Sequence, residues 1–272
     1  MKLRTIDDLQ GLKKEHVGAL INSYSFIKEL KTWIKKHRNR RSSLDAVKVV
    51  NCRECEGTGK KTLTPRSTLV AHPSSFGPDA CLRRIWYDLT GELEEISNFT
   101  PELLLIFDIG HAGHAMLQNY CHGMYGDKFQ EEVPSTIDDL LVYGSMDGLI
   151  DLGHMRMAME IKTASNRSYT DITRKGVPKT DHLWQISAYM MANDLPLALF
   201  VYFNKDNSAM TEFLVPFPEY IWAKVEDMLT RVIESDDDGP GPEKPDGSEI
   251  SPYRCKDCVY NHGCDKKLGR KR

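Results

Sequence analysis

Four short motifs follow one another between residues 110 and 189, and each lies on a different expected helix or strand. They are Gly110-x3-His114, Gly144-x2-Asp147, Glu160-x-Lys162 and Gln185-x3-Tyr189. Apolar periodicity and turn residues predict helices around the first and last motifs, and strands around the middle two. A helix, consecutive strands and a further helix in this order restrict the chain to a mixed α/β fold.

The expected elements divide the chain into three parts. Residues 1–80 form a helical region with a basic tip after Lys35 and a breaker-rich loop that carries Cys52 and Cys55. Residues 81–235 form the α/β core, and residues 236–272 form a polar linker with a cysteine-bearing tail. Within the core we expect helices at residues 81–89, 101–120, 181–192 and 219–234, and strands at 128–133, 140–151, 155–163, 197–204 and 210–216.

Composition places few limits on the function. A chain of 272 residues buries enough surface to fold without disulfides. The net charge of −3 is not that of a typical nucleic-acid binder, although a groove can be basic on an acidic protein. No run approaches the roughly 20 apolar residues that span a bilayer, and the polar start does not resemble an export signal. We therefore expect a cytoplasmic protein that makes no membrane contact.

The middle motifs are typical of a site for a hard divalent cation. Glu160 and Lys162 are two residues apart on an expected strand, so their side chains leave the same face. Asp147 ends the preceding strand, and the Ile161 carbonyl lies between the two charged residues. Oxygen ligands suit Mg²⁺ or Mn²⁺, and His114 shifts the preference toward Mn²⁺. Such a cation activates water against a phosphodiester, with Lys162 orienting the water or neutralising developing charge.

Each motif alone has an ordinary structural explanation. The Glu-x-Lys spacing is that of any exposed charged pair, and similar spacings occur at residues 29–31 and 265–267. His111 competes with His114 as a ligand. Gln185 and Tyr189 share one helix face, as a packed pair does. The order of the motifs, rather than any single one, carries the interpretation.

The seven cysteines indicate a second metal site. Cys255, Cys258 and Cys264 lie within ten residues, and a fourth ligand must come from elsewhere. Thiolates in this spacing suit zinc or an iron–sulfur cluster, and His262 is a substitute ligand. Cys52 and Cys55 look like half of a zinc module that His72 or a partner chain would complete. Cys121 is expected to be a buried free thiol.

Taken together, the residues resemble the RecB-like branch of the PD-(D/E)xK nucleases, and within it the iron–sulfur exonucleases. That group includes the CRISPR-associated Cas-four proteins, the nuclease domain of AddB and related phage exonucleases. The family pattern is Cys, GxxxH, GxxD, (D/E)xK, QxxxY and CxxC-x5-C, and this chain matches it in order from Cys81 to Cys264. Met146 stands before Asp147 where other branches have proline.

The resemblance implies a restriction-endonuclease-like mixed sheet flanked by helices, closed by a cysteine-stapled tail. It implies that His114, Asp147 and Glu160 bind Mn²⁺ or Mg²⁺ with the Ile161 carbonyl, and that Lys162 is catalytic. Gln185 and Tyr189 would support the site or touch DNA. It also implies a 4Fe–4S cluster held by four cysteines, with zinc as the alternative: Cys81, Cys255, Cys258 and Cys264.

The implied activity is hydrolysis of phosphodiester bonds at DNA ends, with single-stranded DNA favoured. Such an exonuclease would serve recombination, repair, replication or CRISPR spacer processing. The alternative is a non-catalytic, cluster- or zinc-stapled DNA-binding subunit of a recombination or adaptation complex. The intact Glu160–Lys162 pair favours the enzyme. The sequence leaves cleavage polarity and oligomeric state open.

Overall fold

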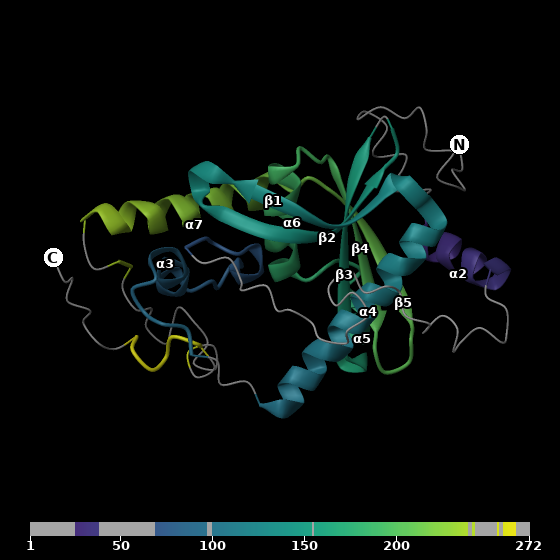
Figure 1. Ribbon diagram of the computed structural model, residues 1–272, viewed down its shortest axis with the longest axis horizontal. Helices are drawn as coiled ribbons and strands as arrows, with labels where there is room; N and C mark the ends of the chain where they lie inside the picture. Colours follow the sequence, from purple (N-terminus) through teal and green to yellow (C-terminus); the bar gives the residue numbers. More distant parts are fainter. Residues whose placement is uncertain are drawn as a thin grey trace, which may run out of the picture.

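The computed structural model describes residues 25–37, 69–96, 100–153, 155–238, 241–242, 255 and 258–264. Its centre is one five-stranded sheet whose strands lie side by side in sequence order (Figure 1). The strands are β1 (Phe129–Ile137), β2 (Val142–Asp151), β3 (Arg156–Ala164), β4 (Leu197–Asn204) and β5 (Met210–Pro216). All neighbouring pairs are antiparallel except β3 and β4, which are parallel. Short 3-10 turns precede β1 (Gly126–Lys128) and β2 (Asp138–Leu140).

The parallel pair in the middle requires a long connection. Parallel neighbours cannot be joined by a hairpin, so the chain must cross over a face of the sheet before β4 begins. Two helices make this crossover, α5 (Asn166–Lys175) and α6 (Thr180–Ala192). The predicted mixed α/β fold is therefore confirmed, and a mixed sheet between helices is consistent with a restriction-endonuclease-like core.

One face of the sheet is covered by α4 (Pro101–Tyr125) and α2 (Phe26–His37). Met157, Met159 and Ile161 of β3 point to this side and are fully buried, together with Leu117 of α4. Alternation along β3 then sends Glu160 and Lys162 to the opposite side. The two faces of β3 therefore differ, one apolar and packed against α4 and the other carrying the charged pair.

The other face is covered by α6, with α7 (Glu219–Asp238) and α3 (Leu82–Thr90) packed beyond it. A 3-10 turn at Pro73–Ser75 also contacts α6. The tail returns to α3, as Figure 1 shows in yellow beside the dark blue helix. Ile96 donates a backbone hydrogen bond to Val259 of this tail at 3.1 Å. The first helix of the core and the cysteine-bearing tail therefore lie together.

The predicted elements are found with few changes. Both strands after α6 have the predicted bounds, and α3, α4, α6 and α7 differ from theirs by a few residues. The helix α5 was not predicted, and β1 runs past Pro134 to Ile137. The predictions for the basic tip beyond His37, for Cys52 and Cys55, and for residues 265–267 lie outside the described residues. No described helix is long and apolar enough to cross a membrane.

Candidate active site

Strands β2 and β3 separate at the point where the middle motifs lie. Their pairing runs from Asp151–Arg156 to Gly148–Met159 and goes no further. Asp147 is the next residue on β2, and Glu160 is the next on β3. β3 stays paired with β4 beyond this point, through Ala164. The two predicted acids thus flank a fork in the sheet, one of them on a strand held rigidly from its other side.

Asp147 joins the fork to helix α4. Its Oδ2 accepts a hydrogen bond from the backbone N–H of Ile161 at 2.7 Å, across the gap between the strands. Its Oδ1 lies 3.2 Å from Nδ1 of His114. Burial lowers the pKa of His114. The hydrogen bond to Asp147 and the negative charges of Asp147 and Glu160 raise it by more, so the pKa of His114 is raised overall. The predicted histidine and aspartate are in direct contact.

Glu160 and Lys162 form a buried ion pair, with 2.7 Å between Glu160 Oε1 and Lys162 Nζ. The same ammonium group donates to Gln185 Oε1 at 2.8 Å. Burial raises the pKa of Glu160 to about 7, against the attraction of Lys162 and with repulsion from Asp147. Burial lowers the pKa of Lys162, but the charges of Glu160 and Asp147 outweigh it and raise the pKa overall. Each member of the pair therefore favours the charged form of the other, while burial opposes it.

Gly144, from the second motif, leaves room for the ring of Tyr189, from the fourth. A Cβ on Gly144 would lie 2.9 Å from Cε1 of Tyr189 and 3.0 Å from Cδ of Pro73. Tyr189 is only 4% exposed and is hydrogen-bonded to Gln185. Burial, followed by the charge of Glu160, raises its pKa. Such a tyrosine packs the site from inside.

Gly113, rather than Gly110, is the glycine that allows α4 to approach the sheet closely. A Cβ on Gly113 would lie 2.9 Å from Cγ2 of Thr163, whereas one on Gly110 would meet Thr163 Oγ1 at an ordinary 3.4 Å. The close approach brings His114, the next residue, within reach of Asp147. His111, the rival ligand, is exposed on the same helix.

Three polar residues near the fork were not found from the sequence. Gln118 donates from Nε2 to the Asp147 carbonyl and to Glu132 Oε1, both at 2.9 Å. His182 lies 2.7 Å from the Tyr202 hydroxyl, and burial followed by the charge of Lys162 lowers its pKa to about 3. Gln118 is four residues after His114, so helical spacing would have indicated it. Glu132 and His182 had no comparable signal.

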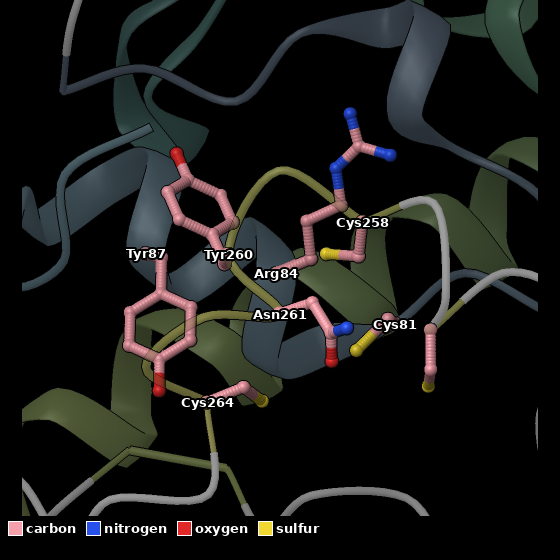
Figure 2. A pocket seen from close by; sticks show the side chains of 8 residues that line it. Cys81, Arg84, Tyr87, Cys258, Tyr260, Asn261 and Cys264 are labelled. Atoms are coloured by element: carbon pink, nitrogen blue, oxygen red, sulfur yellow. The ribbon is translucent and has the colours of Figure 1, made fainter. Parts of the chain in front are cut away.

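The four predicted cysteines line one small cavity, shown in Figure 2. Cys81 caps the N-terminus of α3, and Cys255, Cys258 and Cys264 come from the tail. The tail is held there by protein contacts, since the Tyr260 hydroxyl donates to Asp88 Oδ1 at 2.6 Å. Other residues of the cavity are Arg84, Tyr87, Tyr260 and Asn261. Cys121 is buried elsewhere, 3.6 Å from the Met159 sulfur.

The donor atoms fit metal ions chemically, although they are not arranged around a common point. Within the described part of the chain, no group of three or more His, Cys, Asp or Glu side chains could hold a metal ion as it stands. Glu160 Oε2 is nonetheless buried without a hydrogen-bond partner, which a bound cation would correct. Burial raises the pKa of Cys81, and the charges of Cys258 and Cys264 raise it further despite a backbone hydrogen bond from Arg84. Four thiolates in the cysteine cavity therefore need a positive charge beside them, such as that of a metal ion.

Comparison with known proteins gives only distant similarities. No family model and no curated protein sequence matches the chain. An alkaline exonuclease from Laribacter hongkongensis is 15% identical with a TM-score of 0.46, over 60% of this chain and 84% of that one. The structure of SSO0001 is 16% identical with a TM-score of 0.45, over 91% and 99%. A phage-related exonuclease from Haemophilus somnus 129PT is 12% identical with a TM-score of 0.35, over 55% and 76%. At these values the similarities assign neither a family nor an activity.

Proposed function

We propose that this chain is a metal-dependent DNA exonuclease that hydrolyses phosphodiester bonds at DNA ends, preferably of single strands. The observation that carries the proposal is the fork between β2 and β3. There a histidine, two carboxylates and a lysine from three separate elements come together, although 48 residues separate the first from the last (162 minus 114). Burying a cluster of charged side chains lowers the stability of the fold, so a merely structural role explains the cluster poorly.

His114, Asp147 and Glu160, with the Ile161 carbonyl, would hold Mn²⁺ or Mg²⁺. A divalent cation bound there supplies a water of lowered pKa and stabilises negative charge on the phosphate. The chain's own part is to hold the Glu160 carboxylate in place beside Lys162. Because its pKa is about 7, Glu160 becomes an anionic ligand only near and above neutral pH.

Lys162 is placed to act on the phosphate. Its ammonium group is held between Glu160 Oε1 and Gln185 Oε1, at 2.7 Å and 2.8 Å, and its raised pKa keeps it charged. A fixed positive charge at this position would orient the attacking water and offset the charge that builds as the bond to the leaving oxygen breaks. Gln185 and Tyr189 would hold the lysine and strand β2 in place.

The test uses DNA labelled at either the 5′ or the 3′ end, single-stranded and duplex, with and without Mn²⁺. Lys162→Ala and Asp147→Ala should each abolish stepwise release of nucleotides. Lys31→Ala, in the similarly spaced Glu29–Lys31 pair of α2, is the matched control and should cleave as wild type does. Wild-type protein that binds these DNAs without cleaving any of them would instead support the DNA-binding subunit.

We also propose that Cys81, Cys255, Cys258 and Cys264 bind a 4Fe–4S cluster. Four thiols in one cavity support it, and the counter-charge argument applies equally to zinc. Protein purified without oxygen should be brown and contain iron, and Cys258→Ser should lose both properties while Cys121→Ser keeps them. Colourless protein with one zinc per chain would assign the site to zinc.

A further inference from the structure

Glu132 has a backbone conformation that is unusual inside a strand. Its φ angle is +50°, in the left-handed region that residues other than glycine rarely adopt. Four other described residues share a positive φ without being glycine, and all lie outside the strands: Leu69, Leu141, Asp194 and Ser208. Strain of this kind persists only where the surroundings impose it, and it is concentrated at functional sites.

The strained residue faces the active-site aspartate. Strands β1 and β2 pair on both sides of this point, through Glu131–Gly148 and Val133–Met146. Glu132 and Asp147 are the residues between these pairs, and the pairing is interrupted there. The interruption thus lies beside the fork at which β2 leaves β3.

The carboxylate of Glu132 joins three elements at this position. Oε1 accepts from Gln118 Nε2 of α4 at 2.9 Å, and Oε2 accepts from Ser145 Oγ of β2 at 3.0 Å. Gln118 is 5% exposed and donates from the same nitrogen to the Asp147 carbonyl, also at 2.9 Å. The amide of Gln118 is therefore fixed from one side by Glu132, and it fixes the backbone of Asp147 from the other.

We propose that Glu132 is a positioning residue for Asp147, acting through Gln118 and Ser145. By holding the backbone on each side of Met146, it keeps the Asp147 carboxylate on the Ile161 N–H and beside His114. The inference deepens the proposed function, on which its kinetic consequence rests. What Glu132 supplies is a pair of hydrogen-bond acceptors in a fixed place, so its shape matters more than its charge.

The consequence can be measured without metal or DNA. The Ile161 amide donates to the Asp147 carboxylate, so its hydrogen–deuterium exchange reports whether that carboxylate is in place. Glu132→Gly relieves the strained backbone and removes the carboxylate, and Glu132→Asn also tolerates positive φ but is too short to reach Gln118. Glu132→Gln keeps an acceptor for Gln118 and can donate to Ser145. Glu131→Gln, one residue away, is the matched control.

We expect Ile161 to exchange at least about tenfold faster in Glu132→Gly and Glu132→Asn than in wild type. In Glu132→Gln and Glu131→Gln it should stay within about threefold of wild type. Ile161 protection that is unchanged in both Glu132→Gly and Glu132→Asn would overturn the proposal. So would an equal loss in Glu132→Gln, because charge rather than hydrogen bonding would then be responsible.

The kinetic arm separates this inference from the proposed function. On single-stranded DNA with Mn²⁺, Glu132→Gly should lower kcat by about 10- to 100-fold with KM unchanged, as a misplaced catalytic group does. Glu132→Gln should retain kcat within about threefold. If wild type cleaves no DNA, the proposed function fails, while Ile161 exchange still decides the role of Glu132. A uniform loss of thermal stability without a selective change at Ile161 would mean a merely structural role.

Discussion

Replacing Gly110 or Gly113 of α4 by alanine should have different effects on stability. Both changes raise helix propensity, which is worth about 1 kcal/mol in a helix interior. At Gly110 the new methyl group meets Thr163 Oγ1 at 3.4 Å, an ordinary contact. At Gly113 it would meet Thr163 Cγ2 at 2.9 Å, too close for two carbon atoms. Gly110, which defines the motif, is thus replaceable, whereas Gly113, at one of the motif's unspecified positions, is not.

The magnitudes follow from these contacts. Gly110→Ala should stabilise the protein by up to about 1 kcal/mol, since nothing opposes the gain in propensity. Gly113→Ala adds an overpacking cost of roughly 1–3 kcal/mol, which cancels or exceeds that gain. Moving α4 outward would also separate His114 from Asp147, so the same variant should lose nuclease activity. Thr163→Ser removes the methyl group involved and should restore most of the stability of Gly113→Ala.

The assay is equilibrium unfolding in denaturant of the metal-free variants, followed by far-ultraviolet circular dichroism and compared at equal m-values. Gly110→Ala should unfold at a higher denaturant concentration than wild type, and Gly113→Ala at the wild-type concentration or below. Equal shifts for the two alanine variants would refute the reasoning. So would a failure of Thr163→Ser to raise the midpoint of Gly113→Ala, because the clash would then lie elsewhere.

Three further outcomes are expected. Burial, against the attraction of Lys162, raises the pKa of Glu160 to about 7 from 4.5, so the folded state binds this proton more tightly than the unfolded state. The unfolding free energy of metal-free protein should therefore fall as pH rises from about 5 to about 8, by roughly 3 kcal/mol more than in Glu160→Gln; parallel pH profiles would contradict this. Gly144→Ala should cost about 1–3 kcal/mol in denaturant unfolding and reduce DNA cleavage, because its methyl group would lie 2.9 Å from the Tyr189 ring; wild-type values for both would exclude the contact. Burial raises the pKa of Cys258, and the positive charge of Arg84, whose buried Nε has no hydrogen-bond partner, opposes that rise. Arg84→Gln should therefore retain less iron or zinc per chain than an Arg167→Gln control, as measured by elemental analysis.

The elements that the sequence predicted well are those whose apolar pattern matches their burial. β4 is buried along nearly its whole length and begins after Pro196, so its bounds could be predicted. Helix α5 could not, because Ile172 is its one buried residue and no apolar periodicity exists. Its signals are the Ser165 cap, which accepts from Ser168 N–H, and Gly176 in the left-handed region at its end. A crossover between β3 and β4 is required because these strands are parallel, and the sequence did not reveal that they are.

Strand β1 extends beyond its predicted end at residue 133, through Pro134 to Ile137. β1 is at the edge of the sheet, where a residue without an N–H group is tolerated. The same strand holds Glu132, whose importance depends on a backbone angle and on hydrogen bonds to α4. Motif order predicted the residues that lie at the fork, but the part played by Glu132 depends on three-dimensional contacts that no spacing encodes.

The contact between α3 and the tail also sets an order of events during synthesis. Cys255 follows Cys81 by 174 residues (255 minus 81), and the rings of Tyr87 and Tyr260 contact each other at a tilt, with 5.1 Å between their centroids. A ribosome adding about 5–20 residues per second needs roughly 10–35 s to reach the tail after it has made Cys81. During that time the thiol of Cys81 and the outer face of α3 await their partners, and the last strand of the sheet, which ends at Pro216, is made 39 residues before Cys255 (255 minus 216). The growing chain therefore contains every strand of the fork before its cysteine site can form.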